Sequence, residues 1–376
     1  MTLMKIRLAR FFLAALAAAF ALLTPNARAW DAVGHKIVNE VALAALPADF
    51  PAFVREPANA ERVAFLANVP DRWRNVDPAL RQSGGSWTDH FLDIEQFADA
   101  GLDAHTVPSL RYDFALQFAA GRAAHLDKFP VIDPAKNTDH TREWPGFAPW
   151  AIAEYFAKLQ SAFGYLKAYQ EMGGTPAEIA NSQADVVYVM GVMGHYVGDC
   201  AQPLHTTVHH AGWVGPNPHG YSTWSGIHAW IDGGFIAKAG IKSADLTPRL
   251  TALEPFKFTP RADGRDAAFV AAMDYVIAQN ALVEPLYQLE KAGLLGHGEQ
   301  PITPEGRAFI EGQLLKGGQM LGRLWLTAWK TAPIDTYLRS QLAKRQQAAA
   351  TAAVKPATEA KPAAGAQPAA PNGPAK

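Results

Sequence analysis

Apolar residues recur along most of the chain at intervals of three and four, the spacing of amphipathic helices. The longest such segment begins near Thr175 and Pro176 and includes an apolar run that ends at Val197. Further helices are predicted over 35–46, 58–68, 109–121, 149–170, 267–289, 304–328 and 333–342. Pro285 is expected to kink or shorten one of them. No useful run of alternating residues predicts a strand, so the pattern indicates an all-α fold, a single mostly helical domain with long loops.

Both ends of the chain differ in composition from the part between them. Residues 1–29 combine a basic start, an apolar run from Phe11 to Leu23 and a small-residue cleavage motif that ends at Ala29. This order is typical of a secretory signal peptide, with an uncleaved anchor as the alternative. Residues 346–376 are rich in Ala, Pro, Lys and Gln, which predicts a disordered tail. The helical domain is therefore expected to span 30–345 of a secreted or periplasmic protein.

The charge and cysteine content exclude some classes of function. The chain has 34 basic and 35 acidic residues, so no broad basic surface for duplex nucleic acid is expected. Cys200 is the single cysteine, which excludes an intrachain disulfide and favours a bacterial periplasm or exterior for a secreted chain. We expect its thiol to be a small buried group of the helix rather than a reactive one.

Histidine and aspartate recur one helical turn apart. His195 and Asp199 are separated by four residues, and His228 and Asp232 repeat this spacing. Imidazole and carboxylate groups on one helix face are typical ligands of zinc. Each residue alone is more often a core or surface residue, but jointly they predict a site for several metal ions. The candidate ligands are Trp30, His35, Asp71, His90, His195, Asp199, His205, His228 and Asp232.

The motifs around these positions resemble those of the zinc-dependent phospholipase C and single-strand-specific nuclease superfamily. They are Trp30-x-x-x-Gly34-His35, Asp71-x-x-Arg74, His90-Phe91-x-Asp93, His195-x-x-Gly198-Asp199-x-x-Gln202-Pro203-Leu204-His205 and His228-x-x-x-Asp232. The resemblance covers the region from Trp30 to Asp232 and implies three zinc ions. It implies a first ion held by Asp71, His90, His195 and Asp199. A second ion would be held by the amine and carbonyl of Trp30 with His35 and Asp199, and a third by His205, His228 and Asp232.

The same resemblance implies hydrolysis of phosphodiesters. Zinc ions bind phosphate oxygens and lower the pKa of a bound water from ~15.7 to ~7. Asp71 is expected to steer the proton of that water, and Arg74 to pair with phosphate in the transition state. A surface salt bridge is the alternative for Arg74. A zinc-binding protein without catalysis, marked by a closed ligand set, is the alternative from another class.

Several residues favour the nuclease branch over the phospholipase branch. Trp30 and His35 are five residues apart and the last motif ends in Asp232, as in the nucleases. Phe91 and Asp93 match positions that in those enzymes stack a base and bond its edge, and stacking is worth roughly 1–3 kcal/mol per base. Core packing is the alternative for Phe91.

Other residues depart from the nuclease pattern. Ala201 and Gly233 stand where that pattern has His and Asn. The aromatic loop over 209–225 could also receive a quaternary ammonium headgroup. The expected substrate is nonetheless single-stranded DNA or RNA, cleaved to 5′-nucleotides, with 3′-nucleotidase activity in addition. A phospholipid is the alternative substrate, and no protein partner is implied.

Overall fold

The computed structural model describes residues 30–73 and 87–354. Helices dominate this part of the chain, and its β pairing is limited to one isolated bridge between Leu92 and Gly146. The predicted all-α fold is therefore confirmed. None of the described helices is both long enough and apolar enough to serve as a membrane span.

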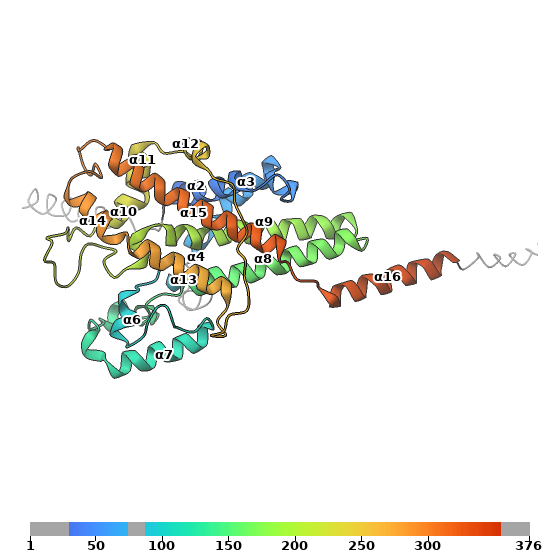
Figure 1. Cartoon of the computed structure of the whole chain (residues 1–376), viewed down its shortest axis with the longest axis horizontal. Coiled ribbons are helices and arrows are strands. Elements are labelled where there is room, and N and C mark those ends of the chain that lie inside the picture. The colour runs from blue at the N-terminus through green and yellow to red at the C-terminus, as the bar shows by residue number, and fades with distance from the viewer. Residues whose placement is uncertain (1–29, 74–86, 355–376) are drawn as a thin grey trace, which may run out of the picture.

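Helix α9 (Pro176–Ala201) lies at the centre of the molecule (Figure 1). It packs against α8 (Ala148–Glu171), α15 (Pro304–Lys330), α3 (Pro57–Leu66) and α2 (Ala32–Ala45), and α2 also packs along α15. Every residue of α9 from Met190 onward is buried. The end of α9 that carries His195 and Asp199 is therefore enclosed by other helices.

The sequence explains how these helices begin and how closely they approach. Thr175 and Glu178 form a capping box at the start of α9. On the buried side, a side chain on Gly194 would come within 1.7 Å of Asn39 Oδ1, so only glycine permits this contact between α9 and α2. The Asn39 amide donates to the carbonyls of Val63 and Gly191, at 2.8 and 3.0 Å. One buried asparagine thus joins α2, α3 and α9 beside the site.

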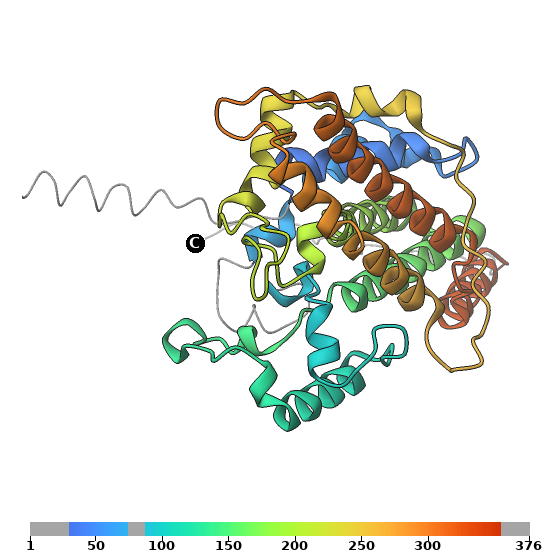
Figure 2. The same ribbon diagram turned by 60° about the vertical axis from the view of Figure 1, so that its left-hand side comes forward.

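Most of the other helices lie around this centre (Figure 2), whereas the C-terminal helix projects away from it (Figure 1). The α-helices are α4 (Val69–Trp73), α6 (Glu95–Asp99), α7 (Arg111–Ala124), α10 (Ile227–Ala229), α11 (Phe235–Ala239), α12 (Ser243–Leu246), α13 (Ala267–Asn280), α14 (Val283–Lys291) and α16 (Thr336–Val354). The turns of other pitch that bear on the site are η2 (Trp87–His90), η6 (Pro203–Thr206) and η7 (Trp230–Gly234). Short turns elsewhere are η1 (Ala52–Arg55), η3 (Leu126–Lys128), η4 (Pro134–Lys136), η5 (Thr141–Glu143) and η8 (Thr247–Arg249).

Two predicted boundaries need correction. The single helix expected over 267–289 is two helices, α13 and α14, and Pro285 lies in the first turn of α14, where its missing N–H is not needed. Helix α16 continues to Val354, so the expected end of ordered structure at 345 is too early. Its Ala, Gln and Arg residues favour helix without burial. Gln346 is also fixed, because its side chain donates to the Met172 carbonyl at 2.8 Å.

Some predictions concern residues outside the described ranges. These are the signal peptide over 1–29, Arg74, and the tail from 355 to 376. The Arg74 role and the cleavage before Trp30 stay predictions.

Candidate metal centre

Candidate ligands from six separate parts of the chain converge beside the buried end of α9. Asp71 comes from α4, His90 from η2, His205 from η6 and His228 from α10, while Asp232 lies in η7 and His35 in the first turns of α2. Apart from Asp71, which is 12% exposed, each of these side chains is buried.

Asp199 lies at the middle of this cluster and is fully buried. Its Oδ1 atom is 3.3 Å from His35 Nε2. Its Oδ2 atom is 3.0 Å from His90 Nδ1 and 3.3 Å from His195 Nε2. The carboxylate therefore meets imidazole nitrogens on both of its oxygens, an arrangement that is compatible with a ligand shared by two metal ions.

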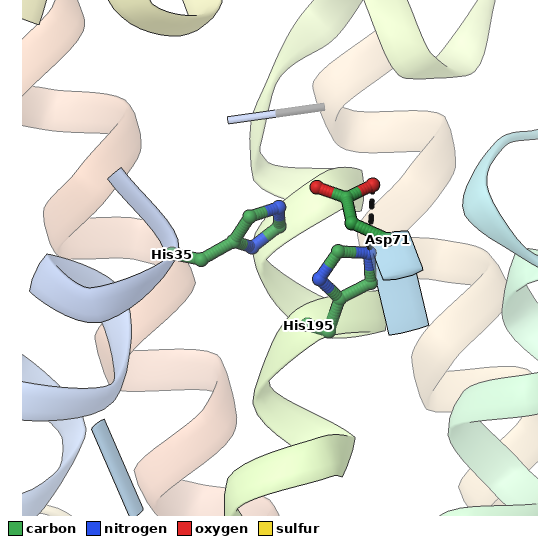
Figure 3. A group of neighbouring side chains, drawn as sticks. All are labelled: His35, Asp71 and His195. Carbon is green, nitrogen blue, oxygen red and sulfur yellow. Dashed lines mark ion pairs between the residues drawn. The ribbon is translucent and has the colours of Figure 1, made fainter. Parts of the chain in front are cut away.

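His195 connects Asp199 to the more exposed side of the cluster. Its Nε2 atom is 3.9 Å from Asp71 Oδ1, and its ring stacks on His35 with the centroids 4.0 Å apart (Figure 3). Its Nδ1–H donates to the Ala67 carbonyl at 2.6 Å, which leaves the Nε2 lone pair for a metal ion. Burial lowers the pKa of His195 to about 4, although Asp199 opposes this shift. The imidazole is therefore neutral at neutral pH, the form that binds metal.

The ligand atoms near His195 fall into two overlapping groups. One is His35, Asp71 and His195, and the other is His90, His195 and Asp199. Since only one nitrogen of His195 remains for coordination, these groups form a shared centre rather than two independent sites. The resemblance assigns His35 to an ion with Trp30 and Asp199. In the structure His35 contacts Asp199 and also lies within reach of Asp71 and His195.

A third group consists of His205, His228 and Asp232, as the resemblance implies. The Nδ1–H of His205 donates to the His90 carbonyl at 2.8 Å, and that of His228 to the His210 carbonyl at 3.3 Å. Because a carbonyl can only accept, both rings keep their Nε2 lone pairs, and these atoms lie 3.0 Å apart. His228 Nε2 is also 3.0 Å from Asp232 Oδ2. Three ligand atoms therefore face one point.

The local backbone of Asp232 differs from the regular helix that was expected. Residues Trp230–Gly234 form a π-helical turn after α10. Such turns insert an extra residue and are frequent at functional sites. Burial raises the pKa of the Asp232 carboxyl, while His228 and Gln202 oppose that rise.

Trp30 is fully buried beside the π-turn. The next backbone N–H, that of Asp31, donates to the Asp232 carbonyl at 3.1 Å. Gly233 permits this approach, because a side chain there would come within 2.6 Å of Asp31 Oδ2. The structure thus explains one departure from the nuclease pattern. The role of the Trp30 amine as a ligand stays a prediction.

The second departure, at Ala201, also follows from packing. Ala201 is fully buried against α15, and a Cβ on Gly317 would lie 3.0 Å from the Ala201 Cβ. This interhelical contact has no room for an imidazole. Cys200 beside it is fully buried, as expected, and burial raises the pKa of its thiol.

The predicted substrate-binding residues lie next to His90 in the sequence. Phe91 is half-buried, and its ring meets Trp87, which is 38% exposed, edge to face at 6.5 Å. Asp93 is buried, and its Oδ2 accepts from the Gln96 amide at 2.9 Å. Burial, with a smaller contribution from Glu95, raises the pKa of Asp93 to about 8.

The aromatic rings of the loop over 209–225 pack on one another and on Tyr287 and His297 outside the loop. Trp213 stacks on His209 with the centroids 3.9 Å apart, and it also contacts Tyr221, which is buried. The faces expected to receive a quaternary ammonium group are thus partly used within the loop.

Two polar residues of the site received no role from the sequence. Asn39 lies one turn after His35 on the buried face of α2, and a polar residue at such a position was the available signal. Gln202 was noted as part of a motif, but nothing in the spacing indicated that it bonds Asp232.

Compared with models of protein families and with curated proteins, the chain matches none of them. The case for a metal site therefore depends on the donor set. The buried imidazoles and carboxylates could hold divalent metal ions at as many as three groups. In three of the imidazoles, those of His195, His205 and His228, the Nδ1–H donates to a backbone carbonyl. The donor set fits zinc.

Proposed function

We propose that this chain is a secreted zinc-dependent phosphodiester hydrolase that acts on single-stranded nucleic acid. The observation that carries the proposal is an unbroken series of contacts from Asp71 to Asp232, through His195, Asp199, His205 and His228, in which every step is 3.9 Å or shorter. A cluster with a shared carboxylate suits hydrolysis better than storage of separate ions.

The position of each residue in the site suggests its role in the proposed hydrolysis. Bound zinc would supply positive charge for the phosphate oxygens and a water of lowered pKa. Asp199, fully buried, would hold its place through the surrounding imidazoles. Asp71 is the most exposed of the described ligand side chains, and it would accept the proton that the attacking water gives up. Arg74, three residues later in the sequence, would pair with the phosphate as negative charge develops.

The aromatic pair beside His90 supports nucleic acid as the substrate. Trp87 and Phe91 both keep part of their surface accessible, and they belong to the same short segment as a candidate ligand. Aromatic faces of this kind stack unpaired bases without requiring a particular sequence. A base in a duplex is already stacked on its neighbours, so this pair favours single strands.

The test is an assay of the purified protein on single-stranded DNA, duplex DNA and phosphatidylcholine vesicles. We expect release of nucleotides from single-stranded DNA, loss of this activity with a chelator, and recovery when zinc is returned. Release of phosphocholine without nucleotides would identify a phospholipase C instead. Bound zinc without hydrolysis of any of these substrates would identify a zinc-binding protein.

A further inference from the structure

Gln202 lies where α9 ends and η6 begins, and its side chain is fully buried. Its backbone N–H donates to the Asp199 carbonyl at 3.0 Å, and its own carbonyl accepts from the His205 N–H at 3.0 Å. The main chain of this residue therefore fixes the distance between two candidate ligands from different groups.

The side chain of Gln202 reaches a third candidate ligand. Its Nε2 donates to Asp232 Oδ1 at 2.7 Å, and its Oε1 accepts from the Leu204 N–H at 2.6 Å. Since the Leu204 N–H can only donate, it decides which end of the amide faces Asp232. Both ends of the side chain are thus engaged, and these two hydrogen bonds fix its orientation.

We propose that Gln202 is a positioning residue for a metal ion at the group of His205, His228 and Asp232, an inference that depends on the proposed zinc site. With Oδ1 of Asp232 held by the amide, Oδ2 faces His228 Nε2. A neutral donor suits this place, because it orients the carboxylate without adding a positive charge that would repel the ion. Gln202 also connects this group to Asp199 through its backbone.

The variant that tests the proposal is Gln202→Met, which keeps the length of the side chain and removes the donor. Outer hydrogen-bond partners of metal ligands typically contribute 10–100-fold in affinity, so we expect one zinc ion to bind about 10–100-fold more weakly. The matched control is Gln313→Met. Gln313 is also buried, and its amide donates to the carbonyl of Ala201, the residue before Gln202. The same amide donates to the side chain of Gln279, which is not a candidate ligand.

The measurements are zinc content by elemental analysis and zinc affinity by competition with a chromophoric chelator. We expect Gln202→Met to weaken one ion and leave the others, and Gln313→Met to keep the parent content and affinity. Parent affinity for every ion in Gln202→Met, or loss of the same ion in Gln313→Met, would overturn the proposal.

A result for the parent protein separates this inference from the proposed function. If the parent binds no zinc, both fail, whereas zinc binding by the parent with no change in Gln202→Met refutes the positioning role alone. Should Gln202→Met not fold, Gln202→Asn replaces it. That variant keeps an amide but is one methylene too short to reach Asp232. Weaker binding of one zinc ion would support the positioning role, and parent affinity for every ion would refute it.

Discussion

Replacing Gly198 with alanine tests the packing that holds the metal centre. Gly198 lies in α9 directly before Asp199, and an added Cβ would come within 2.9 Å of His35 Nδ1. The imidazole has little room to retreat, because it is fully buried and stacks on His195. The matched control is Gly312→Ala in α15, where an added Cβ has no neighbour within 4 Å among the described residues.

The expected difference follows from two opposing effects. Alanine in place of glycine stabilises a helix interior by about 1 kcal/mol. An extra methyl in a packed core costs about 1–3 kcal/mol. We therefore expect Gly198→Ala to change the free energy of unfolding by between roughly 0 and −2 kcal/mol, while Gly312→Ala raises it by about 0.5–1 kcal/mol.

Urea unfolding of the metal-free proteins gives the free energy of unfolding of each variant. Zinc titration then gives the zinc affinity of each variant as a second measurement. An added Cβ at Gly198 would lie 2.9 Å from His35 Nδ1, closer than packed atoms approach, so the imidazole must shift in Gly198→Ala. The zinc affinity of this variant should therefore fall, while that of Gly312→Ala stays at the parent value. Equal stabilisation in the two variants would refute the reasoning, since it would mean that the imidazole does not pack against Gly198.

Three further predictions concern single side chains. Asp199→Asn should lose zinc and activity, since this carboxylate faces three imidazoles at 3.0–3.3 Å. The control Asp185→Asn, on the exposed part of the same helix, should lose neither. Unchanged zinc content of Asp199→Asn by elemental analysis would rule out the ligand role. The pKa of the Asp93 carboxyl is about 8 in the folded protein, against an ordinary value of 3.8. Its contribution to the free energy of unfolding is therefore fully present below pH 3.8 and is lost as the pH rises through 8. Asp93→Asn should thus gain unfolding free energy relative to the parent from pH 5 to pH 8; a constant difference in urea unfolding would contradict this. Phe91→Ala should raise KM for oligonucleotides far more than for a small phosphodiester, and equal changes would indicate packing instead of stacking.

The sequence pattern located the long helices because their boundaries are local. The helix expected from Thr175 or Pro176 is α9, and the one expected over 304–328 is α15. Proline at the first turn and a capping side chain act within a few residues, so they can be recognised without the fold. The break between α13 and α14 lacked such a signal, because Pro285 lies past it.

The candidate site could be predicted only in part. Four-residue spacing on a helix made the pairing of His195 with Asp199 predictable, and the structure gives 3.3 Å between their nearest atoms. The π-turn at Asp232 and the orienting role of Gln202 could not be predicted, since both depend on contacts between residues far apart in the chain. Arg74 lies outside the described residues.

By itself, the sequence determined the helical class of the fold and the set of residues that offer imidazole and carboxylate groups. These follow from local propensity, periodicity and residue type. Only the tertiary structure decided that Asp199 lies between His35 and His90, and that His205 faces His228. The physical reason is that each of these contacts joins segments that lie apart in the chain. Gly194 and Asn39, for example, permit the close packing of α2 on α9 that brings His35 to Asp199.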